Sequence, residues 1–235
     1  MLLQLLILLN IWWGASVGLG HNQPYVEQSS FNLHVQDENN QLVPLFLNSD
    51  GRYRWSDSAF IFSVENGELT TSIPMTEVQA GTTLRDAYMA AQAKYFPATG
   101  TLPDTLFFTM PQYNTWIELM YNQNQADILR YAHAIIDNGF PSGVLMIDDN
   151  WQRYYGNFDF KAERFPDPKA MVDELHALGF KVMLWICPFV SPASPEYRAL
   201  SATGYLLKNP HGGTAILNWW NGYSACYDLT NPDAA

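Results

Sequence analysis

The sequence predicts an α/β fold: the first three to four units of a (β/α)8 TIM barrel, preceded by part of an N-terminal β-sandwich domain. After Pro103, apolar strand-like runs alternate with helical patterns and recur roughly every 38 residues, as expected for consecutive β-loop-α units. Before Pro97, turn dipeptides separate short segments of alternating apolar and polar residues, which is typical of antiparallel hairpins. Hydrophobic residues make up 48% of the 235-residue chain, enough for a sizeable core.

Residues 1–20, MLLQLLILLNIWWGASVGLG, are expected to form a secretory signal peptide that is cleaved within Gly14 to Gly20. An apolar run bounded by small residues fits the central region and cleavage site of such a leader. No Lys or Arg precedes the run, so a mispredicted start or a short anchor are the alternatives. The protein is therefore expected to be exported (secreted, periplasmic or in the secretory-pathway lumen), with no membrane span after signal removal.

Residues 21–100 are expected to form the partial β-sandwich. Turns are predicted at Asn39-Asn40, Asp50-Gly51 and Asn66-Gly67. The segment AGTTLRDAYMAAQAKYFPATG then changes to a helical period, with one face formed by Leu84, Ala87, Tyr88, Ala91 and Tyr95. Residues 97–103 are the predicted linker, because prolines bound them.

Residues 104–235 are expected to begin the barrel. Its first three strands are predicted in TLFFTMPQY, GVLMID and KVMLWICPFV, and the helices in NQADILRYAHAIIDNG, DPKAMVDELHALG and SPEYRALSATG. Gly139 is placed to end the first helix, and Asp167 to cap the second. Three strands cannot close a barrel, so the chain is expected to be the N-terminal part of a longer protein.

Composition excludes several classes of function. A formal charge of −11, from 23 acidic and 12 basic residues, argues against a nucleic-acid partner. Cys187 and Cys226 are expected to be buried free thiols. No third carboxylate or histidine is spaced to complete a metal shell, and no phosphate loop, dinucleotide fingerprint or Ser-His-Asp order is present, so no metal or cofactor is predicted.

The candidate site lies where the predicted strands end. Asp148 and Asp149 follow a strand that reads as buried on both faces, and the carboxyl ends of parallel strands are where α/β folds bind ligands. Carboxylates among tryptophans suit a sugar, whose hydroxyls donate hydrogen bonds and whose C–H faces pack on indole rings. The alternative is structural: Asp148 pairs with Arg153 or Arg164, and Asp149 caps a loop.

The sequence resembles glycoside hydrolase family 31, the retaining α-glycosidases, and in particular its myogenesis-regulating-glycosidase group. The resemblance rests on three ordered stretches: PQYNTWIELMYNQNQADILRYA, IDDNW with GNFDFKAERFPDPKAMVDELHALGFKVMLWICPFVSP, and WWNGYSACYDLTNP. It implies that Asp148 binds sugar hydroxyls in the −1 subsite. The other implied or expected substrate-binding residues are Asp149, Trp151, Trp185, Trp220 and, less directly, Gln112.

The resemblance also implies a two-carboxylate mechanism that needs no cofactor. The nucleophile and the acid/base of the family follow later strands and would lie beyond Ala235, so no catalytic residue is assigned, and the 235-residue chain alone is expected to be inactive. The doubled aspartate is similar to the clan-related α-galactosidase families 27 and 36, which favours an α-galactoside over an α-glucoside. A non-catalytic carbohydrate-binding or interaction protein is the alternative. The oligomeric state is left open.

Overall fold

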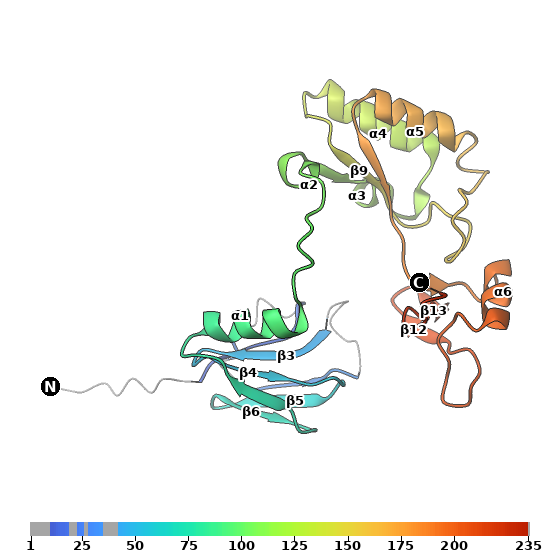
Figure 1. Cartoon of the computed structure of the whole chain (residues 1–235). Coiled ribbons are helices and arrows are strands. Elements are labelled where there is room, and N and C mark those ends of the chain that lie inside the picture. Colours follow the sequence, from blue (N-terminus) through green and yellow to red (C-terminus); the bar gives the residue numbers. More distant parts are fainter. Residues whose placement is uncertain (1–9, 19–22, 26–27, 35–41, 235) are drawn as a thin grey trace. The chain divides into compact units, whose positions relative to one another are not determined.

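The computed structural model describes residues 10–18, 23–25, 28–34 and 42–234, which form two compact units divided between Thr101 and Leu102 (Figure 1). The division falls within the predicted linker. Each unit has its own hydrophobic core and is described separately below. Among the described residues, no helix is both long and apolar enough to cross a membrane.

The N-terminal unit contains two antiparallel sheets that enclose one core. The first has the order β1-β3-β4-β7 and comprises β1 (Trp12–Ser16), β3 (Leu42–Asn48), β4 (Arg52–Trp55) and β7 (Thr76–Gln79). The second has the order β2-β5-β6 and comprises β2 (Ser29–Asn32), β5 (Ile61–Glu65) and β6 (Glu68–Thr71). Phe46 from the first sheet packs on Phe62 from the second, with ring centroids 4.7 Å apart. The predicted antiparallel, two-sheet organisation is thus present.

Two of the turns predicted for this unit are present in the structure. Asn66 and Gly67 both have positive φ, 52° and 79°, and join β5 to β6 in a two-residue hairpin, as the Asn-Gly pair predicts. Gly51, with φ 88°, ends the turn between β3 and β4. The predicted turn at Asn39-Asn40 lies outside the described residues.

One helix, α1 (Leu84–Tyr95), packs against the first sheet (Figure 1). Thr83 caps it and shares a reciprocal capping box with Asp86. Ala87 and Ala91 are buried against Tyr53, as the predicted face requires. Tyr88 is 54% exposed, so the buried stripe is narrower than the sequence pattern indicated.

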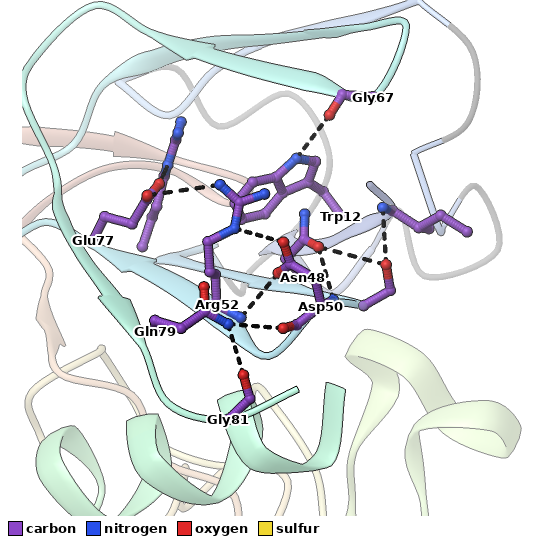
Figure 2. Close-up of polar contacts among 11 residues, drawn as sticks. Trp12, Asn48, Asp50, Arg52, Gly67, Glu77, Gln79 and Gly81 are labelled. Atoms are coloured by element: carbon purple, nitrogen blue, oxygen red, sulfur yellow. Dashed lines mark hydrogen bonds and ion pairs between the residues drawn. The ribbon is translucent and has the colours of Figure 1, made fainter. Parts of the chain in front are cut away.

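Strand β1 uses residues that the sequence analysis assigned to a cleaved leader. Trp12 is 2% exposed in the sandwich core, and its indole N–H donates to the Gly67 carbonyl at 3.1 Å (Figure 2). The Arg52 and Arg54 guanidinium groups lie over its ring, 5.6 and 5.1 Å from the centroid, and both form ion pairs with Glu77. Cleavage within Gly14 to Gly20 would remove this indole, so the packing argues against that cleavage window; residues 1–9, 19 and 20 lie outside the described residues.

The C-terminal unit contains three parallel strands in the order β10-β9-β8: β8 (Gln112–Asn114), β9 (Val144–Ile147) and β10 (Lys181–Leu184). Helices α4 (Gln125–Asp137) and α5 (Pro168–Ala177) lie side by side over this sheet (Figure 1). Asn124 caps α4, Gly139 follows it with φ 79°, and Asp167 caps α5 ahead of Pro168. This β-α-β-α-β order agrees with the predicted start of a barrel.

The first predicted strand is wrong over most of its length. Residues Leu106–Thr109 form the short helix α2, because the Asp104 side chain accepts from the Leu106 N–H at 2.9 Å and starts a helical turn. The strand itself begins only after Pro111. It is followed by the short helix α3 (Trp116–Leu119) and a 3-10 turn, η2 (Met120–Asn122).

The third predicted strand is also shorter than expected, because β10 ends at Leu184. Phe189 and Val190 form a separate strand, β11, in a small antiparallel sheet with β13 (Gly222–Cys226) and β12 (Leu217–Trp219). Helix α6 (Pro195–Thr203) begins after its cap Ser194 and ends at Gly204, as predicted.

Gly143→Ala should destabilise the junction of β8 and β9. A Cβ at Gly143 would lie 2.1 Å from the Pro111 carbonyl oxygen, which also accepts from the Val144 N–H at 3.0 Å. Because the two backbones cannot separate without losing this hydrogen bond, we expect the free energy of unfolding of this unit to fall by about 1–3 kcal/mol in urea denaturation.

Gly213→Ala is the matched control, because the nearest atom to its added Cβ belongs to the flexible Asn209 side chain, at 3.3 Å. Equal effects of the two substitutions would contradict the expected steric conflict at Gly143.

Candidate functional site

The acidic pair lies at the carboxyl-terminal edge of the parallel sheet. Asp148 directly follows Ile147, the last residue of β9, and Trp185 directly follows β10. The Trp185 N–H donates to the Ile147 carbonyl at 2.9 Å, so the two strand ends lie next to each other. The structure therefore brings Asp148, Asp149 and Trp185 to the edge at which α/β barrels bind their ligands.

Asp148 is 7% exposed and is held through its backbone and one oxygen. Its N–H donates to the Thr115 hydroxyl at 3.0 Å, and its Oδ1 accepts from the Asp149 N–H at 2.7 Å. Within the described part of the chain, neither Arg153 nor Arg164 forms an ion pair with it. The structural alternative of an aspartate paired with either arginine is therefore not what the structure shows.

Thr115 is a site residue that sequence reasoning missed. It is fully buried, follows the last residue of β8, and donates its hydroxyl hydrogen to Gln123 Oε1 at 2.6 Å while accepting from Asp148. The misplaced first strand concealed it, because Thr115 directly follows the true strand end at Asn114. A strand predicted to begin after Pro111 would have found it.

Asp149 is almost completely buried, with 1% of its surface exposed. Its Oδ2 accepts from the Tyr155 hydroxyl at 2.9 Å, and its Oδ1 is buried without a hydrogen-bond partner among the described residues. Burial raises the pKa of this carboxyl, and the hydrogen bond from Tyr155 only partly opposes that effect. The neutral form of Asp149 is thus favoured more than in an exposed aspartate.

Tyr155 connects Asp149 to the aromatic side chains. Its ring lies 6.0 Å from Trp185 and 5.1 Å from Trp219, in both cases edge to face. Its hydroxyl also accepts from the Asn221 side-chain amide. Burial, followed by the Asp149 charge, raises the pKa of the phenol, so Tyr155 stays protonated and can donate to Asp149.

The predicted tryptophans occupy different environments. Trp151 is 1% exposed, packs on Phe160 and donates its indole N–H to the Trp185 carbonyl at 2.7 Å, so it is a core residue that supports the third strand end. Trp220 is 56% exposed and packs edge to face on Trp219. Trp219 stacks on Phe189 with centroids 4.1 Å apart and, unlike Trp220, contacts Tyr155.

Gln112 does not line the same edge. It is the first residue of β8 and pairs with Val144, the first residue of β9, so it stands at the amino-terminal end of the strand. Its side-chain amide donates to the Phe107 carbonyl at 2.9 Å. The first strand was predicted to start several residues too early, which placed Gln112 at the wrong end of the strand; its contribution to substrate binding stays a prediction.

A polar cavity of about 280 Å³ lies beside Tyr155. Asn150 is fixed in its wall: φ is 74°, its amide donates to the Tyr121 carbonyl at 2.6 Å, and its oxygen accepts from Lys161. The cavity is lined by Tyr121, Asn150, Gln152, Arg153, Tyr154, Tyr155, Ser191 and Asn221. Amides, hydroxyls and phenol rings of this kind suit a ligand rich in hydroxyl groups.

The described residues contain no group of three or more His, Cys, Asp or Glu side chains arranged to hold a metal ion. Cys187 and Cys226 are free and half-buried, somewhat less enclosed than predicted. Burial raises the pKa of the Cys187 thiol to about 11, so it is not a reactive thiolate at neutral pH.

Asp149 should make stability depend on pH. Because its folded-state pKa is raised, the folded state retains the proton while the unfolded state releases it, and stability is lost as pH rises from the unfolded value of about 3.9 through the folded one. Asp149→Asn cannot ionise, so we expect its Tm to decline less steeply than that of the wild type as pH rises above the unfolded value. Asp173→Asn, at an exposed helical site, is the control; an unchanged slope in Asp149→Asn would contradict the expectation.

Similar proteins were found at the level of sequence and of structure. The chain is 32% identical to the mouse (Mus musculus) myogenesis-regulating glycosidase over 142 residues, which is 60% of this chain and 20% of that protein. It is 26% identical over 223 residues to an uncharacterized family 31 glucosidase, ORF2, of Pseudescherichia vulneris, covering 92% of this chain and 41% of that one. The chain thus spans less than half the length of these two relatives.

The comparison with solved structures gives a similar result at the level of the fold. The crystal structure of a GH31 α-xylosidase from a soil metagenome, complexed with xylose, matches 96% of this chain and 33% of that chain with a TM-score of 0.67 at 23% sequence identity. The family described as glycosyl hydrolases family 31 TIM-barrel domain matches residues 108–235, which is more than half of the chain and begins close to the boundary between the two units. The chain therefore belongs to glycosyl hydrolase family 31.

Proposed function

We propose that the whole protein is a retaining α-glycosidase that removes terminal α-linked sugars. The observation that carries the proposal is the acidic pair at the carboxyl-terminal edge of a family 31 barrel sheet, next to Trp185 and free of any arginine partner among the described residues. The relatives named as a glycosidase, a glucosidase and an α-xylosidase support the α-glycosidic bond as the target.

In this proposal the chain supplies sugar binding. Asp148 accepts hydrogen bonds from sugar hydroxyls through the oxygen that is not bonded to the Asp149 N–H, and Trp185 packs on the C–H face of the ring. The nucleophile and the acid/base, which must flank the scissile bond about 5–5.5 Å apart, lie in the part of the enzyme beyond residue 235. Terminal α-hexosides, α-galactoside before α-glucoside, are the proposed substrates.

The test is hydrolysis of aryl α-galactoside, α-glucoside and α-xyloside by the whole protein, followed by NMR of the first-formed anomer. Retention gives the α-anomer first, and the matched aryl β-glycosides serve as controls. Release of the β-anomer first would overturn the retaining mechanism. Sugar binding without turnover of any α-glycoside would favour a carbohydrate-binding protein instead.

A further inference from the structure

We propose that Asp149 is a positioning residue that acts on the sugar site through Tyr155, rather than a residue that binds the sugar itself. The inference rests on the proposed function, since it concerns the same site. It assigns different roles to two adjacent aspartates: Asp148 binds the sugar, and Asp149 holds the Tyr155 side chain in place.

The carboxylate of Asp149 is buried and bonds to a protein side chain rather than facing solvent. One of its oxygens accepts from the Tyr155 hydroxyl at 2.9 Å, and the other is buried without a partner among the described residues. Only 1% of the residue is exposed, compared with 7% for Asp148. A sugar hydroxyl would have to displace Tyr155 or enter the protein to reach this carboxylate.

Tyr155 contacts other aromatic side chains of the site, so a change at Asp149 that moves the Tyr155 ring would also affect them. Its ring contacts Trp185, which follows the third barrel strand, and Trp219, which belongs to the β12–β13 hairpin. Its backbone N–H and carbonyl both bond to Ser191, at 3.2 and 2.9 Å. The main chain of Tyr155 is thereby fixed, and its hydroxyl is held by the hydrogen bonds with Asp149 and Asn221.

The phenol also shapes the polar cavity. Tyr155 and Asn221 both line it, and the Asn221 amide donates to the same hydroxyl that donates to Asp149. The three side chains therefore form a chain of hydrogen bonds from Asn221 to Tyr155 to Asp149. Removing the acceptor at its end frees Tyr155 to reverse its hydroxyl and frees Asn221 to turn away from the cavity wall.

The experiment compares Asp149→Ala, Tyr155→Phe and the double variant in the whole protein, with Asp148→Asn as the sugar-contact comparison. We expect KM for the best α-glycoside to rise about threefold to tenfold in each single variant, with little further change in the double variant, because both remove the same hydrogen bond. Asp149→Asn keeps an acceptor for Tyr155 and should recover most of the loss. Additive effects of Asp149→Ala and Tyr155→Phe would overturn the proposal.

Monodeoxy substrates provide a second, independent test. If Asp149 bound a hydroxyl directly, Asp149→Ala would cost nothing with the sugar that lacks that hydroxyl; we expect the same loss with every monodeoxy sugar. For Asp148→Asn we expect the loss to disappear with one of them. A monodeoxy sugar that abolishes the effect of Asp149→Ala would overturn the positioning role.

A spectroscopic measurement separates this proposal from the proposed function. Near-ultraviolet circular dichroism of the aromatic side chains needs no substrate, and we expect Asp149→Ala and Tyr155→Phe to change it while Asp149→Asn and the exposed control Asp173→Asn do not. If the wild-type protein hydrolyses no α-glycoside but this pattern holds, the proposed function fails and the positioning contact stands. An unchanged spectrum in Asp149→Ala would overturn the positioning contact whatever the activity.

Discussion

Trp12→Ala is expected to lower the free energy of unfolding of the N-terminal unit by about 3–5 kcal/mol, the usual range for removing a buried large aromatic side chain. Trp12 is 2% exposed and packs edge to face on Phe46, with ring centroids 6.4 Å apart. The substitution also removes the hydrogen bond to Gly67 (Figure 2). It removes as well the ring face over which the Arg52 and Arg54 guanidinium groups lie. The arginines keep their ion pairs with Glu77, so the expected loss comes mainly from the cavity.

Urea denaturation followed by tryptophan fluorescence and by circular dichroism measures this loss. Val17→Ala is the matched control, because Val17 lies just after β1 and is 63% exposed. A loss below about 1 kcal/mol for Trp12→Ala, similar to that of a surface substitution, would show that β1 is not part of the cooperative core.

The packing of Trp12 also affects where an N-terminal leader could be cleaved. Export remains our proposal, on the strength of the apolar run at the start of the chain. The position of Trp12 leads us to expect that the exported protein retains this residue, whereas the predicted cut within Gly14 to Gly20 would remove it. N-terminal sequencing of the exported protein decides between the two.

Local signals in the sequence predicted the helices well. The caps Asp167 and Ser194, each followed by proline, start α5 and α6 where expected, and Gly139 follows α4 with the left-handed backbone that its position predicts. These signals are reliable because a cap or a positive φ depends on a few neighbouring residues. The Asn66-Gly67 hairpin was predictable for the same reason.

One local signal was missed, and tertiary contacts decided what the sequence could not. Residues Leu106 to Thr109 have strand-like composition, yet they form a short helix whose Leu106 N–H donates to the nearby Asp104 side chain. That one error moved Gln112 to the wrong end of its strand and concealed Thr115. Trp151 likewise follows the acidic pair in sequence, but only packing reveals that its ring lies in the core while Trp219 contacts Tyr155.

Asp148→Ala is expected to lower kcat/KM of the whole protein by about 10- to 20,000-fold for the α-glycoside that we propose as its substrate. The range follows from the loss of one or two charge-assisted hydrogen bonds to sugar hydroxyls at about 1.5–3 kcal/mol each, with about 1.4 kcal/mol for each factor of ten. Steady-state kinetics on the aryl α-glycoside measures the effect. The exposed Asp173→Asn on helix α5 is the control for removing a charge elsewhere in the unit.

Asp148 also accepts from the Asp149 N–H, so alanine removes a loop contact together with the charge. Asp148→Asn separates the two roles, because an amide oxygen can keep the contact to the Asp149 N–H while the charge towards the sugar is lost. If the charge binds the sugar, Asp148→Asn should lose at least tenfold in kcat/KM while its Tm stays close to that of the wild type. A variant that keeps kcat/KM within about threefold would show that Asp148 only shapes the loop, since a loss that small is less than one hydrogen bond to a charged group contributes.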